Sequence, residues 1–319
     1  MSEEDLRIRG FREGDYPLLV EVDRAVFPER SWREENYRQA DENKPEKCLQ
    51  QRYVALLGDE VIGHGYFTQL EWSYEPGKFF ISLKILPDYQ GRGFGREFFL
   101  HLLAELEPHD PCKLESYTRE NKPRAVRFLR DRGFEETGRE WEQELQLDDF
   151  EAEKFAGILE KVRARGYSLT SLAELNIDEN LKRELYELVE EVNQDIPSPV
   201  EYTGVDYDSF SRTFARVPGF YPAGYIIARQ DEVPVGISSH YRRPDGRTLY
   251  VTLTGVRREH RGRGLATAMK VKAAETARRE GFKRITATNE IEHEAMLHIN
   301  EKLGFVKKPA WISFARDLN

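Results

Sequence analysis

Hydrophobic and polar residues follow the same order twice along this chain. Runs of alternating or continuous apolar and β-branched residues predict strands in each half. These runs occupy residues 53–67, 78–86, 112–118 and 140–147 in the first half, and residues 225–241, 248–256, 284–289 and 311–318 in the second. A polar turn, "GDE" (58–60) or "QDE" (230–232), splits the first run of each half, which therefore predicts two strands.

Patterns with the period of a helix separate these strands at matching places. They cover residues 16–25, 96–106 and 124–133 in the first half, and residues 180–193, 266–281 and 294–304 in the second. Gly133 and Gly304 suit the left-handed position at a helix C-terminus. The order predicts an α/β fold of α+β type, with a mixed, mostly antiparallel sheet flanked by helices. We expect the strands at 140–147 and 311–318 to close their own halves.

The two halves are copies of one unit. Gly93 and Gly264 are 171 positions apart, and so are Gly133 and Gly304, while Gln90 matches Arg261 at the same offset. A repeat of this length predicts two tandem domains of ordinary size, at 1–150 and 151–319. The segment 145–169 has a charged, helical middle and is interpreted as a connector.

Composition narrows the classes of function. The chain has 319 residues, of which 39% are hydrophobic and 33% charged, with a net charge of −9 and two cysteines. This chain can build cores, lacks the basic footprint of a nucleic-acid-binding protein, and has no cysteine pattern for a disulfide framework or a metal. No apolar run approaches the ~20 residues of a membrane helix, and the acidic N-terminus is no signal peptide. We expect a cytoplasmic protein without metal, membrane or nucleic-acid partner.

Two glycine loops follow a predicted strand and precede a helix, "PDYQGRGFGREFF" (87–99) and "RREHRGRGLATAMK" (257–270). Glycines let the backbone approach a ligand, and the helix start offers unpaired N–H groups, so the pair predicts phosphate or pyrophosphate sites. Arginines add positive charge: Arg92 and Arg96 in the first loop, and Arg257, Arg258, Arg261 and Arg263 in the second. The alternative is a plain strand–helix turn with solvated arginines.

The loops match neither of the common nucleotide motifs. A Walker loop requires a lysine that both lack, and a dinucleotide fingerprint fails at Arg96 and Thr267. The pattern that fits is [QR]-x-x-G-x-[GA], which resembles the acetyl-CoA loop of the GNAT N-acetyltransferases. "RAVRFLRDRGF" and "EAMLHINEKLGF" resemble the penultimate helix of that family with its terminal Gly-Phe. The duplication resembles tandem GNAT proteins of the mycothiol synthase kind.

The resemblance implies acetyl-CoA as cosubstrate in both copies. Pantetheine would lie along the strand before each loop, the loop amides would hold pyrophosphate, and an asparagine after the next strand would contact the cofactor. In the first copy the implied residues are Leu83, Lys84, Ile85, Gln90, Gly91, Arg92, Gly93, Phe94, Gly95, Arg96 and Asn121. In the second they are Thr254, Gly255, Val256, Arg261, Gly262, Arg263, Gly264, Leu265, Ala266, Thr267 and Asn289. The two asparagines are equally suited to helix N-capping.

Direct acetyl transfer to an amine requires a base, an oxyanion donor and an acid for the thiolate. The resemblance implies the backbone N–H of Val256 as oxyanion donor. The family's acidic tyrosine is replaced here by Leu129 in one copy and Asn300 in the other, and Asn300 can donate a hydrogen bond to sulfur. Asp195, Glu201, His240 and Tyr241 are candidate bases, and His293 is interpreted as a solvent-facing helix residue.

The acceptor is expected to be an amine of a small molecule or peptide. The family sets it with the segments that here are 26–47 and 195–210, and Asp195 and Glu201 in the second can receive a cation. Because the second copy has this acidic segment and Asn300, we expect it to be the catalytic copy. A non-catalytic acetyl-CoA-binding regulator or scaffold is the alternative. The sequence leaves the oligomeric state open, and a monomer with pseudo-dimeric domains is compatible with it.

Overall fold

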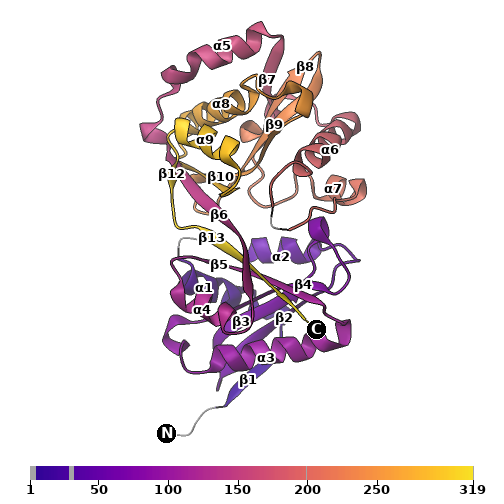
Figure 1. The fold of residues 1–319 in the computed structure, drawn as a ribbon, viewed down its shortest axis with the longest axis vertical. Coiled ribbons are helices and arrows are strands. Elements are labelled where there is room, and N and C mark those ends of the chain that lie inside the picture. Colours follow the sequence, from indigo (N-terminus) through magenta and orange to yellow (C-terminus); the bar gives the residue numbers. More distant parts are fainter. Residues whose placement is uncertain (1–4, 29–31, 199, 319) are drawn as a thin grey trace. The chain divides into compact units, whose positions relative to one another are not determined.

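The computed structural model describes residues 5–28, 32–198 and 200–318 (Figure 1). Contacts divide the chain into an N-terminal unit, Met1–Thr137 with Ile312–Asn319, and a C-terminal unit, Gly138–Trp311. Each unit contains a mixed, mostly antiparallel sheet flanked by helices, as expected. The predicted domains 1–150 and 151–319 thus follow the sequence repeat, whereas the units follow spatial contacts.

The N-terminal unit has the strand order β1-β2-β3-β4-β5-β13. Its sheet is antiparallel from β1 to β4, and β4 pairs with β5 in parallel. The elements are β1 (Leu6–Gly10), α1 (Tyr16–Val26), α2 (Glu34–Glu42), β2 (Gln50–Leu57), β3 (Glu60–Thr68), β4 (Lys78–Ile85), α3 (Phe94–Leu106), β5 (Lys113–Arg119), α4 (Pro123–Arg130) and β13 (Trp311–Asp317).

The C-terminal unit has the order β6-β11-β10-β9-β8-β7, with β10 and β11 parallel. The elements are β6 (Glu135–Gln146), α5 (Ala156–Ala164), β7 (Tyr167–Ser171), α6 (Glu179–Asn193), α7 (Tyr207–Thr213), β8 (Ile226–Gln230), β9 (Val233–Arg242), β10 (Thr248–Val256), α8 (Leu265–Arg279), β11 (Arg284–Glu290), α9 (Glu294–Lys302) and the short β12 (Val306–Lys307). Short 3-10 turns connect several of these elements in both units.

The final strands of the two copies are exchanged. β6 pairs antiparallel with β11 of the second copy, from Arg284 opposite Gln146 to Glu290 opposite Glu140. On β13, Ile312 and Phe314 pack in the core of the N-terminal unit, and the Leu318 N–H donates to the Cys112 carbonyl at 2.8 Å. The expectation that each strand closes its own copy is therefore wrong. Both strands alternate with period two, so the pattern alone does not distinguish the two recipient sheets.

The connector interpretation of 145–169 is wrong in part. β7 begins at Tyr167 and pairs with β8, where it is the counterpart of β1 in the first copy. Val162 of α5 is buried in a cluster with Tyr167 and residues of α8. The five-residue strands "LRIRG" and "YSLTS" carry too few apolar residues to be recognised by their pattern.

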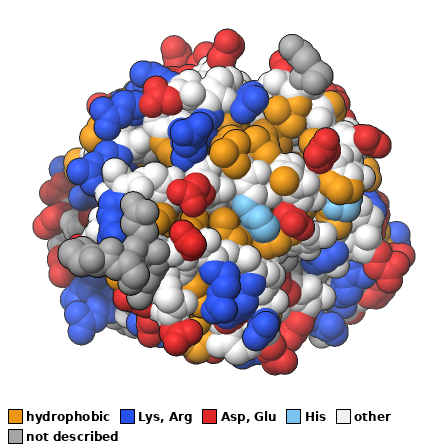
Figure 2. Space-filling model, turned by 90° about the horizontal axis from the view of Figure 1, so that it is seen from below, with side chains coloured by type: hydrophobic (Ala, Val, Ile, Leu, Met, Phe, Trp, Pro, Cys, Tyr) orange, Lys and Arg blue, Asp and Glu red, His pale blue; other side chains and the backbone are white. Residues whose placement is uncertain are grey.

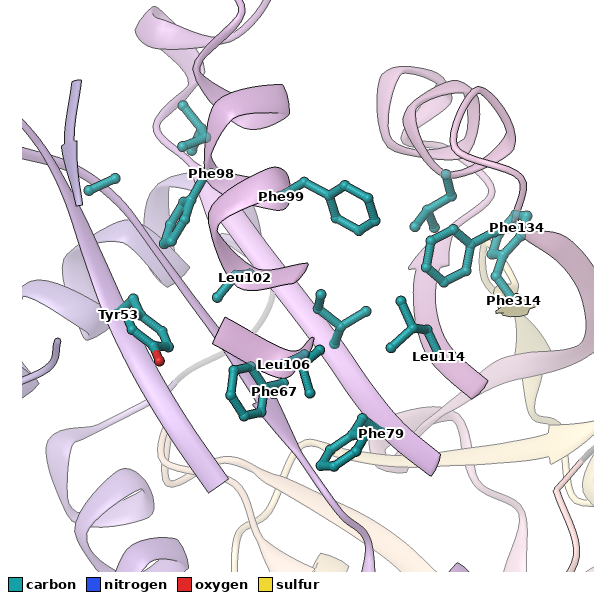
Figure 3. Packing of buried hydrophobic residues seen from close by; sticks show 14 of the residues in the cluster. Tyr53, Phe67, Phe79, Phe98, Phe99, Leu102, Leu106, Leu114, Phe134 and Phe314 are labelled. Atoms are coloured by element: carbon teal, nitrogen blue, oxygen red, sulfur yellow. The ribbon is translucent and has the colours of Figure 1, made fainter. Parts of the chain in front are cut away.

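Helices cover both faces of the N-terminal sheet. α3 and α4 pack on one face, where a Cβ on Gly65 of β3 would come within 3.2 Å of side chains of α3. The next residue, His64, points to the opposite face, where its ring contacts Asp23 of α1. Figure 3 shows the core on the α3 face, with Phe99 directed toward Phe134 and Phe314. The face that carries α1 holds the buried pair Asp23 and His64 beside a small apolar cluster of α1 and α2.

The C-terminal sheet is covered in the same way. α8 and α5 pack against β7, β8 and β9, and α6 packs on the other face, where Val192 fills the space beside Gly255 of β10. In the ranges that the structure describes, no helix is long and apolar enough to cross a membrane. On the face shown in Figure 2, acidic and basic side chains are intermixed, with apolar side chains between them.

Candidate functional site

The parallel strands β4 and β5 separate partway along their length. They are in register from Lys78 opposite Lys113 to Phe80 opposite Glu115, and β4 then continues to Ile85 paired with β3 but not with β5. The opening is a cavity of about 540 Å³. Its walls are Ile81 to Ile85 of β4, the glycine loop, Phe99 of α3 and residues of β5 and α4. A gap of this kind exposes backbone groups of β4 that a neighbouring strand would otherwise pair.

The first glycine loop ends at the mouth of this cavity. Gly91 and Gly93 have φ angles of +82° and +96°, and a Cβ on Gly91 would meet no atom within 4 Å. Gly93 is the N-cap of α3, and its carbonyl accepts hydrogen bonds from the N–H groups of Arg96 and Glu97. Helix geometry leaves the earlier N–H groups without intrahelical partners, so they are available to an anion.

The Gln90 side chain ties the loop to the strand. Its Nε2 donates to the Ile85 carbonyl at 2.8 Å, and in the second copy Arg261 Nε donates to the matching Val256 carbonyl at 2.9 Å. The motif position written [QR] therefore has the same structural contact in both loops. A glutamine and an arginine both fit because each provides an N–H at the end of a long side chain.

Most of the expected cofactor residues of the first copy line this cavity. They are Leu83, Lys84, Ile85, Gln90, Gly91, Gly93, Gly95 and Arg96. Arg92 instead lies over the rings of Tyr89 and Phe94, at 5.5 and 5.0 Å. Asn121 is exposed in the turn before α4, and the N-cap of that helix is Lys122, so the structure gives Asn121 no capping role.

The second glycine loop is more enclosed. Gly264 is the N-cap of α8 with a φ of +86°, and a Cβ there would meet Ile158 Cδ1 of α5 at 2.6 Å. Arg263 donates to the Tyr167 hydroxyl at 2.5 Å and to the Glu259 carbonyl at 2.9 Å. The second loop has the same left-handed glycine before its helix as the first, but residues of α5 and β7 pack against Gly264 and Arg263.

Asp195 neutralises the arginines of the second loop. Arg258 Nε donates to Asp195 Oδ2 at 2.9 Å, and Arg261 forms an ion pair with the same carboxylate. The hydrogen bonds from Arg258 and Arg261 hold the pKa of Asp195 well below its usual range. Asp195, expected to bind the acceptor, is therefore paired with Arg258 and Arg261, which are expected near the phosphates. Glu201 is exposed, and residues 29–31 and 199 of the two acceptor segments lie outside the described residues.

Asn300 lies in a buried group of amides. Its Nδ2 donates to Gln143 Oε1 and to Asn289 Oδ1, both at 2.8 Å, and the side chain is 0% exposed. Gln143 comes from the exchanged strand β6. The Asn300 Oδ1 atom is buried without a hydrogen-bond partner among the described residues. Asn289 therefore binds another side chain and does not cap α9, whose N-cap is His293.

The remaining candidates of the second copy lie inside its fold. His240 Nδ1 lies 2.8 Å from the Gly224 carbonyl, and burial lowers the pKa of His240 to about 4. Burial raises the pKa of Tyr241 to about 12. Thr254 Oγ1 shares a hydrogen bond with Ser238 Oγ at 2.9 Å. His293 is half-buried and not solvent-facing as expected, and burial lowers its pKa.

The first copy contains a buried polar cluster that no pattern in the sequence predicts. The Asp23 carboxylate of α1 lies 2.7 Å from His64 Nε2 and accepts a hydrogen bond from Lys84 Nζ at 2.7 Å. Tyr37 of α2 donates to the same carboxylate. These residues are far apart in the chain, so no local sequence motif identifies them. Lys84 lines the cavity, and so do Val26 and Phe27 at the end of α1.

The electrostatics of this cluster favour a negative Asp23 and a neutral His64. Burial raises the pKa of Asp23, but the hydrogen bond from His64 and the charge of Lys84 outweigh it and hold that pKa far below its ordinary value. Burial also lowers the pKa of His64. Because a carboxylate only accepts, His64 donates from Nε2, which leaves a lone pair on Nδ1. Nδ1 is buried without a partner among the described residues.

Comparisons with known proteins identify the fold. The model of the acetyltransferase (GNAT) family matches residues 16–134 and 184–305. A tandem GNAT protein from the clavulanic acid biosynthesis pathway is similar, with 16% identity, a TM-score of 0.78 and 98% of each chain covered. A GCN5-related N-acetyltransferase from Sphaerobacter thermophilus has 16% identity and a TM-score of 0.70, with 98% of this chain and 95% of that chain covered. None of the curated proteins searched matches the chain. The family match covers both halves, and the chain belongs to the GNAT family of acetyltransferases.

Proposed function

We propose that the chain transfers an acetyl group directly from acetyl-CoA to the amine of a small molecule or peptide, with the cosubstrate held in the N-terminal unit. The cavity between β4 and β5 is the observation that supports this proposal. It is bordered by the free backbone of β4 on one side and by the start of α3 on the other. Those are the two features that an extended amide chain ending in a pyrophosphate requires.

The residues present fit this cosubstrate. Gly91 has open space where a side chain would be, so the backbone can approach a phosphate closely. The N–H groups before Arg96 and the positive end of α3 would hold the pyrophosphate, and Arg96 adds charge at the cavity wall. Leu83 to Ile85 would bind the pantetheine through backbone hydrogen bonds. When bound, the thioester supplies the activated acetyl group.

We propose that the pair Asp23 and His64 removes the proton that the acceptor amine must lose. Asp23 fixes the His64 tautomer and leaves a lone pair on Nδ1. Because His64 is buried and does not line the cavity, the proton would reach Nδ1 through water. The Lys84 ammonium lies beside the same carboxylate and keeps it ionised. In this assignment His64 is the base and Asp23 is its positioning residue. We assign no residue of this copy to protonate the departing CoA thiolate, because Leu129 has no proton to donate.

The expectation of a catalytic C-terminal copy stays a prediction, but its two grounds are weakened. Asp195 is ion-paired with loop arginines, and both amide protons of Asn300 are used within the protein. We therefore propose that the N-terminal copy performs the chemistry, and that the C-terminal copy binds acetyl-CoA more weakly. The backbone N–H of Val256, or of its counterpart Ile85, would be the oxyanion donor of its own copy.

Thiol release from acetyl-CoA against a panel of amines tests this function. We expect release that depends on an added amine and is lost in His64→Asn. Binding of acetyl-CoA without release by any amine supports the alternative, a regulator or scaffold. The Cys112→Ser variant removes the exposed thiol and controls for reaction of the protein's own cysteine with the thiol reagent.

A further inference from the structure

Lys270 is a buried amine in the first half of α8. Its side chain is 3% exposed, and burial alone accounts for the lowering of its pKa, with no carboxylate contributing. Its neighbour is the Phe305 ring, whose centroid lies 5.5 Å from Nζ. A lysine in such a place is costly, because an ammonium loses its hydration when it is buried. The position therefore calls for an explanation.

The first copy shows what this position faces. Phe99 precedes Lys270 by 171 positions, and α3 and α8 begin at the equivalent residues Phe94 and Leu265. The Phe99 ring packs edge-on against Phe134 (Figure 3). In the second copy Lys270 packs against the matching residue, Phe305. Phe99 lines the cavity of the first copy. The repeat therefore places an amine where the first copy has an aromatic wall of its acetyl-CoA site.

The neighbouring positions have changed from apolar to polar as well. Leu129, another residue of the cavity wall, is matched by Asn300, and Phe314 of the exchanged strand is matched by Gln143. The buried Asn300 Oδ1 atom has no partner among the described residues. The second copy thus contains a polar interior where the first copy has an apolar one. A ligand with both polar and reacting groups suits that interior better than a hydrocarbon does.

Electrostatics make this amine reactive near neutral pH. Burial lowers the pKa of Lys270 to about 7. The titratable groups that face it are His240 of β9 and His293 before α9, whose own pKa values are lowered, His240 to about 4. Both histidines are therefore neutral where Lys270 titrates. A desolvated lysine that is partly uncharged at neutral pH is a nucleophile.

We propose that Lys270 is an acylation site, at which its Nζ takes the acyl group of an acyl-CoA bound in the C-terminal unit. The lone pair of Nζ attacks the thioester carbonyl carbon, the C–S bond breaks, and an amide bond forms. The amine proton goes to the departing thiolate, so that the products are N-acyl-lysine and free CoA. This proposal depends on the proposed use of acetyl-CoA as donor.

Peptide mass spectrometry of the full chain, incubated with acetyl-CoA and no added amine, tests the proposal. Lys272 is the internal control, because it lies on the same helix but donates to the Leu169 carbonyl at 2.6 Å and lies 3.6 Å from Glu174. We expect Lys270 to be acetylated at least tenfold faster than Lys272, with a rate that rises with pH through about 7. Acetyl phosphate, which lacks the CoA part, should label Lys270 no faster than Lys272.

Three results overturn the proposal: an unmodified Lys270, labelling equal to that of Lys272, or equal labelling of Lys270 by acetyl phosphate and acetyl-CoA. Lys270→Arg should lose the modification and keep amine-dependent release of CoA by the N-terminal unit. If the arginine is too large for the site and the variant does not fold, Lys270→Met takes its place in this test. If acetyl-CoA binds and is turned over while Lys270 stays unmodified, the acylation site fails and the proposed function stands. If nothing binds, both fail.

Discussion

Single residues differ sharply between the two copies although their helices and strands follow the same order. Asp23 and Asp195 both bind cations, but Asp23 is 1% exposed in a network with His64 and Lys84, and Asp195 binds the arginines of a loop. The sequence identified Asp195 because it stands in an acidic segment, and it missed Asp23 because its partners are 41 and 61 positions away. Partners brought together by tertiary structure leave no local pattern.

Asp23→Asn should lower the free energy of unfolding by about 3–5 kcal/mol, because it leaves Lys84 without its buried counter-ion. The folded pKa of Asp23 is depressed, so the stability it provides is present above the unfolded pKa near 4 and is lost as pH falls further. Buried His64 has a lowered pKa and destabilises in the same direction on acidification. Denaturant titrations at several pH values measure both effects. If the free energy of unfolding falls as steeply at low pH in the variant as in the wild type, this role of Asp23 is contradicted.

His64→Asn should reduce kcat/KM by at least a hundredfold, since a positioned base contributes about 10²–10⁴ in rate. Because the pKa of His64 is lowered from its ordinary value, the wild-type activity should fall on acidification only below that ordinary value. A pH–rate profile of wild type and variant measures this. An unchanged acidic limb in the variant would assign the base elsewhere.

Asp195→Asn should strengthen CoA binding by the C-terminal unit, because it releases Arg258 and Arg261 from their shared carboxylate. A gain of about tenfold corresponds to ~1.4 kcal/mol. Calorimetric titration with CoA gives the affinity, and Glu201→Gln, which removes an exposed acid of the same segment, is the control. An equal gain in both variants would indicate only a change of net charge.

At the scale of elements, the pattern of the chain predicts most of the fold. The helices 16–25 and 180–193, the strand pairs around the turns and the glycine loops lie where periodicity and turn residues indicate. Gly133 and Gly304 have φ angles of +78° and +91°, as expected for helix C-termini. The exchange of β6 and β13 was missed, because two strands of similar pattern fit either sheet and only side-chain packing separates them.

Phe314→Ala should destabilise the N-terminal unit by about 3–5 kcal/mol, although the residue is near the C-terminus, because its ring is 1% exposed in that unit's core. Hydrogen exchange measured by mass spectrometry localises the loss of protection. We expect it in β4, β5 and α3, with residues 138–311 less affected. Loss confined to β10 and β11 would show that the strand belongs to the other sheet.

The whole molecule is a duplicated GNAT protein whose two glycine loops have diverged in their surroundings. The first loop is open to a cavity of about 540 Å³, and the second is covered by α5 and neutralised by Asp195. The family, the repeat and the loops follow from the sequence, because motif spacing survives duplication. The difference between the copies does not, because it depends on α5 and on a strand contributed by the other copy.

Calorimetric titration with acetyl-CoA of the matched variants Gly93→Val and Gly264→Val tests the central claim, that the N-terminal cavity is the principal acetyl-CoA site. Both glycines have a positive φ, so each substitution strains its own loop, and at Gly264 the added side chain also meets Ile158. Thermal unfolding therefore checks that each variant folds. We expect two binding events in the wild type, with the tighter one lost in Gly93→Val and kept in Gly264→Val. Loss of the tighter event in Gly264→Val and its survival in Gly93→Val would contradict the account.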